Sequence, residues 1–400
     1  MAHVLMLTPY LPYPPVSGGR MRTYNLIKNL STDYTITLLC FGRPEETAFD
    51  YSPLRAYCDV TVIDRESSPG TLKAALLSLS STKPITMRLY GTEAMRAAVA
   101  RALAEKPVDV IHVESFYMMQ NLPENLSVPV LMSEPAVEYL VWAKHARVAE
   151  PWYTRPGIAL EAFKMRQTEP QVWESADVVG AMSEVDAGVI RKAAPRARVM
   201  LTPNGVDVDY FQPDAAHPRM TNTAMYMGDY KYFPNTDAVG YFVEDIMPRI
   251  KARRPDFHLT LVGKDPTPEM RELAGDDVTV TGLVDDTRPY LWGSTVFICP
   301  LRSGSGTRFK LMEALACGCP VVSTSLGCEG LGAVDGVHML IRDEPQSFAE
   351  AVLELMDHPE RGQAMGAAGR AWVVEKHAWS HSAALVREAY AQAAQQRQAR

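Results

Sequence analysis

The sequence predicts an α/β protein of two domains, each built on a parallel β-sheet. Short, nearly continuous apolar runs alternate with stretches of helical period along the chain, which is the pattern of βαβ units. Continuous apolar runs indicate strands that are buried on both faces, as parallel strands are. The length of 400 residues exceeds the ~100–200 residues of one ordinary core.

The predicted elements follow in order. In the first half, residues 21–30 and 86–106 have helical period, and the predicted strands are 3–7, 34–40, 60–63, 108–113, 128–132, 178–182 and 199–201. In the second half the predicted helices are 238–253, 307–316 and 347–356, and the predicted strands are 224–227, 258–262, 278–281, 296–299, 321–323 and 339–341. The turn-rich segment 203–213 separates the halves, and residues 380–400 form an Ala/Gln-rich helix.

The composition excludes several classes of protein. With 47% hydrophobic and 22% charged residues, the chain is neither disordered nor collagen-like. A net charge of −7 argues against a nucleic-acid partner. Of the six cysteines only Cys317 and Cys319 lie close together, without the spacing of zinc ligands. We therefore expect reduced core thiols and no metal site.

The N-terminus lacks the charged and apolar regions of a signal peptide, and no run reaches 18 apolar residues. These features predict a cytoplasmic location.

Two glycine-rich loops are candidate anion sites. Gly18 and Gly19 stand between the first predicted strand and a helix, where backbone amides can approach an anion; a flexible turn is the alternative. The loop after strand 296–299 is a stronger signal, because its glycines expose amides and its cations suit a diphosphate. Its residues are Arg302, Gly304, Ser305, Gly306, Thr307, Arg308 and Lys310.

The helix after this loop adds a carboxylate and a predicted cap. Ser305 or Thr307 can cap the helix, and Glu313 can accept hydrogen bonds from ribose hydroxyls. The alternative for Glu313 is a salt bridge to Lys310 one turn earlier. The loop is not a P-loop, because the Gly-Lys-Ser/Thr ending is missing.

The run from Pro300 to Thr324 resembles the donor-binding segment of glycosyltransferase family four, glycosyl transferases group 1. Further matching pieces follow the order of that family along nearly the whole chain: Gly18-Gly19, Asn204-Gly205-Val206-Asp207, Gly228, Pro234-Asn235, Val262-Gly263, Gly282-Leu283-Val284-Asp285 and Glu329-Gly330-Leu331.

The resemblance implies a GT-B fold, with two Rossmann-like domains facing each other across a cleft. It implies an acceptor-binding domain at 1–205, a nucleotide-sugar-binding domain at 206–378, and a helix at 379–400 that returns to the first domain. The implied donor-binding residues are those of the two glycine loops, with Gly228, Lys231, Leu283, Val284 and Glu313.

Two departures from the family pattern concern the donor site. The family often has two glutamates eight positions apart, and Ser305 stands where the first would be. The usual Arg and Lys after the first strand of the second domain are also replaced, and Gly228 is followed by Asp229, Tyr230 and Lys231. We therefore assign the diphosphate to Lys310 with Arg308 or Arg302, and to Lys231 as a further candidate.

Candidate acceptor-side residues follow two strands of the first domain. Similar enzymes have a polar residue at the end of strand 108–113, and Glu114 is the first candidate and His112 the second. Strand alternation puts both on one face; a hydrogen-bonded core histidine is the alternative for His112. Glu138, with Glu134 nearby, is the candidate acceptor-binding residue, or an ordinary carboxylate at a helix N-terminus.

Residues 71–106 have six basic and two acidic side chains with leucines between them. Such a face predicts peripheral contact with an anionic membrane, and a solvated helix face is the alternative.

Together these features predict a retaining, metal-independent glycosyltransferase without a cofactor. It would move a hexose from a UDP- or GDP-sugar to a saccharide, lipid-linked or small-molecule acceptor. A nucleotide-sugar epimerase of the same fold and a nucleotide-sugar-binding protein without activity are the alternatives.

Overall fold

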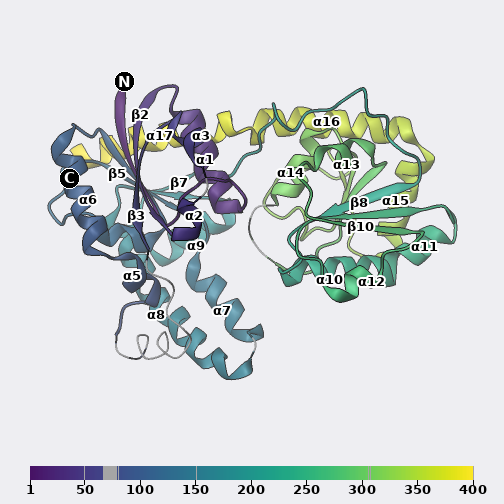
Figure 1. Ribbon diagram of the computed structural model, residues 1–400, viewed down its shortest axis with the longest axis horizontal. Helices are drawn as coiled ribbons and strands as arrows, with labels where there is room; N and C mark the ends of the chain where they lie inside the picture. The colour runs from purple at the N-terminus through teal and green to yellow at the C-terminus, as the bar shows by residue number, and fades with distance from the viewer. Residues whose placement is uncertain are drawn as a thin grey trace. The chain divides into compact units, whose positions relative to one another are not determined.

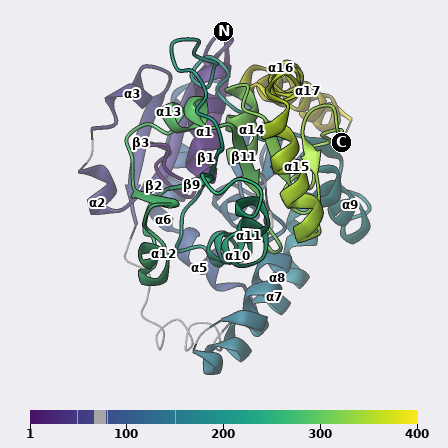
Figure 2. The ribbon, with the colours of Figure 1, turned by 90° about the vertical axis from the view of Figure 1, so that its right-hand side faces the viewer.

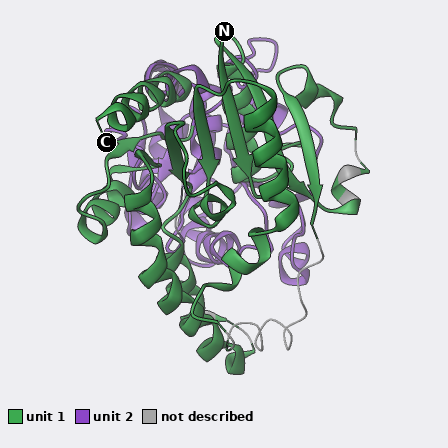
Figure 3. Cartoon of the chain, turned by 90° about the vertical axis from the view of Figure 1, so that its left-hand side faces the viewer, with its two compact units in different colours: residues 1–204, 382–400 green, residues 205–381 purple. Residues whose placement is uncertain are grey.

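The computed structural model describes residues 1–48, 50–65, 79, 81–149, 151–304, 306 and 308–399. Its internal contacts divide the chain into two compact units (Figure 3). Unit 1 consists of residues 1–204 and 382–400, and unit 2 of residues 205–381. The predicted domain boundaries, after residues 205 and 378, fall close to these divisions.

Unit 1 contains a seven-stranded sheet of order β3-β2-β1-β4-β5-β6-β7, and every pair of neighbouring strands is parallel. All seven predicted strands are present. Strands β4 and β5 are buried along their whole length, because helices must cover both faces of a parallel sheet. The strands are β1 (Ala2–Thr8), β2 (Tyr34–Gly42), β3 (Asp59–Asp64), β4 (Val110–Glu114), β5 (Val130–Glu134), β6 (Val178–Ala181) and β7 (Val199–Leu201).

The helices of unit 1 correct one prediction. The single helix predicted at 86–106 is two helices, because Gly91 ends the first and the Thr92 side chain caps the second by accepting from the backbone of Met95. The helical segments are α1 (Gly18–Leu30), α2 (Pro44–Thr47), α3 (Ser52–Arg55), α5 (Ile85–Tyr90), α6 (Glu93–Glu105), η1 (Phe116–Asn121), α7 (Glu138–Val148), η2 (Trp152–Thr154), α8 (Arg155–Ser175) and α9 (Glu184–Ala193).

Helices α7 and α8 form a hairpin that extends away from the sheet of unit 1 (Figures 1 and 2). Neither helix is among the predicted elements. Pro170 lies inside α8, and an internal proline removes a backbone hydrogen bond and argues against a helix in a sequence.

Unit 2 contains a six-stranded parallel sheet of order β10-β9-β8-β11-β12-β13, and all six predicted strands are present. The strands are β8 (Thr223–Met227), β9 (His258–Val262), β10 (Val278–Gly282), β11 (Val296–Cys299), β12 (Val321–Ser323) and β13 (Leu340–Ile341). The helical segments are α10 (Phe233–Tyr241), η3 (Phe242–Ile246), α11 (Met247–Lys251), α12 (Pro268–Glu272), α13 (Arg288–Gly293), α14 (Phe309–Ala316), α15 (Pro345–Asp357) and α16 (Pro359–His377).

The helix predicted at 238–253 begins earlier, at Phe233, and contains the π-helical turn η3. Pro248 follows this turn and has no N–H for the carbonyl four residues before it, which favours the wider turn.

The last helix, α17 (Trp379–Gln398), begins in unit 2 and continues in unit 1 from Ser382 onward (Figure 3). One side of it is buried, through Ala383, Val386, Ala389, Tyr390 and Ala393. None of the described helices is both long and apolar enough to span a bilayer.

Candidate active site

In unit 2 the predicted donor residues gather where the order of the strands reverses. The chain runs from β8 outward to β10 and then returns to β11 on the other side of β8. In open α/β sheets, ligands bind at the carboxyl ends of the strands at such a switch point. Gly228 directly follows β8, and the loop to Lys310 follows β11. The two predicted pieces therefore meet at this edge.

The Lys310 ammonium group is held at this edge by two side chains. Its Nζ donates to Tyr226 Oη at 2.9 Å and to Asn235 Oδ1 at 2.8 Å, and it lies 4.2 Å from the centroid of the Tyr226 ring. Tyr226 Oη also donates to Asn235 Oδ1 at 2.8 Å. Two of three N–H donors are thus used, and no other described residue is recorded as accepting the third.

Gly228 leaves room for this ammonium group. A Cβ at Gly228 would lie 3.1 Å from Lys310 Nζ and 2.8 Å from Asn235 Nδ2. Asn235 Nδ2 in turn donates to the carbonyl of Asp229 at 2.7 Å. A glycine is needed here so that the cation and the loop after β8 can approach each other.

Both ionisable groups on α14 have shifted pKa values. Burial is the main cause that lowers the pKa of Lys310 to about 8, and the Arg308 guanidinium acts in the same direction. Burial raises the pKa of Glu313 to about 7, and Lys310 opposes this shift. No ion pair between Lys310 and Glu313 is recorded among the described residues, so the salt-bridge alternative is not observed. A desolvated cation is stabilised electrostatically when an anion binds beside it.

The loop before α14 has the conformation that its glycines permit. Gly304 and Gly306 have φ angles of 110° and 89°, which residues with a Cβ rarely adopt. Ser305 and Thr307 lie outside the described residues. Helix α14 begins at Phe309, and the buried Arg308 occupies the N-cap position without a side-chain cap of its own.

Two other predicted cations are engaged elsewhere. Arg302 pairs with Asp237 on α10 at 2.6 Å, and its guanidinium lies 4.4 Å from the centroid of the Tyr241 ring. Lys231 is 76% exposed and pairs with Asp265 at 3.2 Å. Lys310 and Arg308 are therefore the cations that the structure brings to the switch point.

Leu283 and Val284 follow β10 at the same edge of the sheet. Leu283 is 77% exposed and Val284 is partly buried. Their predicted contact with the donor remains a prediction.

In unit 1 the switch point lies between β1 and β4. Gly18 and Gly19 begin α1 after the loop from β1, and a Cβ at Gly19 would lie 2.5 Å from the hydroxyl oxygen of Tyr10. After β4, Ser115 has a φ of 75°, an uncommon conformation that accompanies functional sites. The first glycine loop and Glu114 thus share this edge.

Glu114 and His112 form a buried cluster with Arg22. The Glu114 carboxylate lies 3.6 Å from Arg22 Nε and 3.3 Å from His112 Nε2, and all three side chains are buried. Burial alone would raise the pKa of Glu114, but Arg22 and His112 outweigh it and hold the pKa below its usual value. The buried carboxylate is therefore kept ionised.

His112 has the geometry of the core-histidine alternative. Its Nδ1 is 2.7 Å from Tyr390 Oη and its Nε2 is 2.8 Å from Ser133 Oγ, and the side chain is fully buried. Both ring nitrogens are thus engaged within unit 1. Contact of Glu114 or His112 with a transferred sugar remains a prediction.

Glu138 begins α7 and accepts a hydrogen bond from Trp142 Nε1 at 3.2 Å. Burial raises its pKa. Glu134, at the end of β5, accepts from Trp173 Nε1 at 2.9 Å, and burial together with Glu169 raises its pKa well above the usual value. Burial thus raises the pKa of both carboxyl groups at this end of β5, and acceptor binding by Glu138 remains a prediction.

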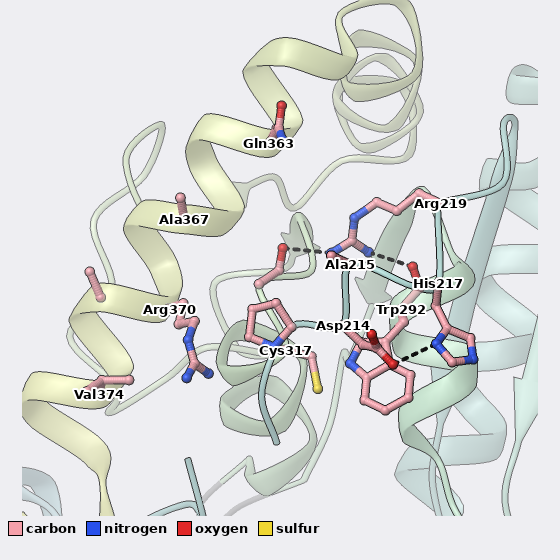
Figure 4. Close-up of a pocket in the computed structure, with 13 residues that line it drawn as sticks. Asp214, Ala215, His217, Arg219, Trp292, Cys317, Gln363, Ala367, Arg370 and Val374 are labelled. Carbon is pink, nitrogen blue, oxygen red and sulfur yellow. Dashed lines mark hydrogen bonds and ion pairs between the residues drawn. The ribbon is translucent and has the colours of Figure 1, made fainter. Parts of the chain in front are cut away.

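A pocket of about 630 Å³ lies at the opposite edge of the unit 2 sheet (Figure 4). Its residues Arg219, Trp292 and Gly318 precede β8, β11 and β12. Arg219 donates to the carbonyls of Trp292 and Gly318, and Arg370 of α16 donates to the carbonyls of Phe211 and Ala316. Both guanidinium groups are thus used to bind backbone carbonyls. The pocket lies at the amino ends of the strands, so it is separate from the switch-point site at their carboxyl ends.

The predicted basic segment 71–106 is described only in part, since residues 71–78 and 80 lie outside the described residues. Of its described cations, Lys106 pairs with Asp59 at 3.4 Å, and Arg96 and Arg101 are exposed on α6.

Arg22, Tyr226, Asn235 and Glu169 contribute to these clusters without being predicted site residues. Asn235 stands in a piece that matches the family pattern, which was the available signal. The others lie in ordinary helical or strand patterns, and only the folded chain brings them to the site.

Residues 221–358, which lie within unit 2, match the family described as glycosyl transferases group 1. The fold of the whole chain is GT-B, as in solved glycosyltransferase structures. Sucrose-phosphate synthase from Thermosynechococcus elongatus superposes with a TM-score of 0.71 at 18% identity, covering 98% of this chain and 99% of that one.

Curated relatives match part of the chain. A phosphatidyl-myo-inositol mannosyltransferase of Mycobacterium tuberculosis is 28% identical over 202 residues, which are 47% of this chain and 52% of the relative. A GDP-mannose-dependent alpha-(1-6)-phosphatidylinositol monomannoside mannosyltransferase of the same organism is 30% identical over 243 residues, 54% of this chain and 61% of the relative. The matches thus span between half and two thirds of these relatives.

Proposed function

We propose that the chain is a retaining glycosyltransferase that moves a hexose from a nucleoside-diphosphate sugar to an acceptor. The Lys310 ammonium group carries this proposal, because it is desolvated, fixed by two side chains, and lies beside Gly228 at the switch point of unit 2. When the bond between the sugar and the diphosphate breaks, negative charge develops on the diphosphate. A positioned cation stabilises that charge more in the transition state than in the ground state.

GDP-mannose is the first donor to test, because two similar mannosyltransferases act on phosphatidylinositol lipids and one is named as GDP-mannose-dependent. UDP-sugars remain the second choice. A lipid-linked acceptor is favoured for the same reason, followed by a saccharide or a small molecule.

The proposed division of labour follows the two units. Lys310 and Arg308 bind the diphosphate, Glu313 accepts from ribose hydroxyls, and the residues of unit 1 bind the acceptor. The reaction is proposed to need no metal, because protein cations take the charge of the leaving group. Retention would arise if a donor phosphate oxygen takes the acceptor proton during attack on the same face.

The test is an assay of the purified chain with GDP-mannose, UDP-glucose and other nucleotide sugars, each with and without phosphatidylinositol or oligosaccharide acceptors. A prior thermal-shift screen selects the donor, because a ligand that binds the folded state raises its stability. We expect nucleoside diphosphate to be released only with an acceptor, and a product with the anomeric configuration of the donor. Release should persist in EDTA.

Other outcomes identify the alternatives. A new epimer of the sugar without any acceptor would identify an epimerase. Tight nucleotide-sugar binding without turnover across the panel would identify a binding protein. A product with the opposite anomeric configuration to the donor would support the transfer reaction but contradict the proposed retention.

A further inference from the structure

The turn of the α7–α8 hairpin exposes aromatic side chains. Trp152 and Tyr153, in η2, are 70% and 66% exposed, and their ring centroids lie 6.4 Å apart. Phe163 on α8 is 60% exposed. No other Trp, Tyr or Phe among the described residues of unit 1 is comparably exposed. Exposed aromatic groups of this kind mark an interaction surface.

Helix α7 continues this surface with apolar and basic residues. Leu140, Lys144 and Arg147 are spaced four and three residues apart, so they lie on one face of the helix. Leu140 is 38% exposed and its neighbour Val141 is 39% exposed. Lys144 and Arg147 are exposed as well. We call these four residues, with Trp152 and Tyr153, the hairpin surface.

The charge of the hairpin is one-sided. Between residues 138 and 167 the exposed charged side chains in the described part of the chain are all basic: Lys144, Arg147 and Arg166. The carboxylates there face inward, since Glu138 accepts from Trp142 and Glu161 pairs with Lys164 at 2.8 Å. Glu150 lies outside the described residues. The whole chain has a net charge of −7, so this basic face differs from the rest of the molecule.

We propose that the hairpin surface docks on an anionic lipid surface. Trp and Tyr rings are favoured at the headgroup level of a bilayer, because one part of the ring is apolar and another forms hydrogen bonds. Basic residues beside them are attracted to anionic headgroups. The turn projects from the sheet of unit 1 (Figures 1 and 2), so it can reach into the headgroup layer of a fluid bilayer. A specific protein–protein interface would instead bury about 800 Å² on each partner.

This docking does not depend on the proposed transfer reaction, and it concerns a different surface from the basic segment 71–106. The experiment is sedimentation of the whole chain with phosphatidylcholine vesicles that contain or lack phosphatidylglycerol, at low and high salt. We expect binding to the anionic vesicles alone, and weaker binding as salt rises.

Two double variants test the two components of the surface. Lys144→Gln with Arg147→Gln should weaken binding to anionic vesicles roughly 10- to 30-fold, from the attraction of each cation to the surface. Trp152→Ser with Tyr153→Ser should weaken it by about 10-fold or more. Val185→Ser is the matched control, because Val185 is 61% exposed on α9 of the same unit and outside the hairpin. It should bind like the parent.

All of these side chains are exposed, so every variant should unfold at the temperature of the parent. The proposal is overturned if the parent binds neutral vesicles equally well, or if both double variants bind like the parent. It is also overturned if the parent associates with itself in light scattering and Trp152→Ser with Tyr153→Ser abolishes that association, since the surface would then join two copies of the chain. Turnover of a soluble acceptor reports separately on the transfer reaction.

Discussion

Lys310 is the residue on which the proposed donor site depends. Tyr226 and Asn235 fix its ammonium group, and burial makes its charge costly in the empty site. If Lys310 binds the diphosphate as proposed, the same contact would serve both donor binding and stabilisation of the transition state.

Replacing this cation is the first prediction. Lys310→Met keeps most of the side-chain volume but removes the charge, and we expect turnover to fall about 100-fold or more, which is the usual effect of removing one stabilising group of this kind. Steady-state kinetics with the donor that the thermal-shift screen selects would measure it. Lys231→Met is the comparison, because Lys231 is largely exposed and pairs with Asp265, and it should lose far less. Equal losses, or a larger loss for Lys231→Met, would reject the assignment of the diphosphate to Lys310.

The pH dependence of nucleotide binding is the second prediction. The cation of Lys310, with a pKa of about 8, is lost as pH rises through that value. The carboxylate of Glu313, with a pKa of about 7, is protonated as pH falls through that value. Both charges are present only between these limits, so affinity for a nucleoside diphosphate should be highest between about pH 7 and about pH 8.

Calorimetric titration of the nucleoside diphosphate across this pH range would test the profile. Lys310→Met should remove the alkaline fall, and Glu313→Gln should remove the acid fall. A parent profile that is flat from about pH 6 to about pH 9 would contradict the proposed roles of both groups.

At the scale of elements, α14 is held in position by close packing against α16. A Cβ at Gly366 of α16 would lie 2.2 Å from the carbonyl oxygen of Gly318, just after α14. Because that neighbour is backbone, the contact cannot be relieved by a side-chain rotation. The absence of a side chain at Gly366 is therefore one reason that the two helices can approach.

The third prediction follows from this packing. Gly366→Ala should destabilise unit 2 by about 1–3 kcal/mol, the cost of overpacking a core, measured by urea unfolding. Gly240→Ala in α10 is the matched control, because nothing lies within 4 Å of its added Cβ. That substitution should stabilise by about 0.5–1 kcal/mol through helix propensity. If the two substitutions had equal effects, packing would not be the cause.

At the scale of the whole molecule, residues 1–204 belong to unit 1, residues 205–381 form unit 2, and the chain returns to unit 1 in α17. The returning helix fills part of the core of unit 1, and Tyr390 bonds the buried His112 on β4. Unit 1 is therefore incomplete until the last residues of the chain are in place.

The fourth prediction tests this dependence. A chain that ends at residue 381 should lose hydrogen-exchange protection in β4 and β1, while the strands of unit 2 stay protected. Tyr390→Phe is the milder variant. It leaves His112 Nδ1 without its partner, and should lower the stability of unit 1 by about 1–3 kcal/mol, the cost of an unsatisfied buried polar group. Full protection of β4 in the shortened chain would show that α17 is dispensable.

The sequence by itself determined the strands, because a buried parallel strand must be apolar along its length, and all thirteen predicted strands are present. It also indicated the glycine loop and Lys310 as a candidate diphosphate site, since a diphosphate needs exposed amides and cations near one another, and this assignment remains a prediction. It did not reveal α8, whose pattern is interrupted by Pro170. Of α7 it indicated only the start, through the alternative that Glu138 is a carboxylate at a helix N-terminus.

Only the tertiary structure decided which cations reach the switch point. In sequence, Lys310 ranks first, Arg302 and Arg308 of the same loop are alternatives, and Lys231 of another loop is a further candidate. In the fold, Asp237 and Asp265 engage two of them, while Tyr226 and Asn235 fix Lys310. The same holds for Arg22, which lies far from Glu114 in sequence and beside it in space. The physical reason is that the apolar pattern of a strand depends on residues close together in sequence. The pairing of charges depends instead on which strand ends the fold brings together.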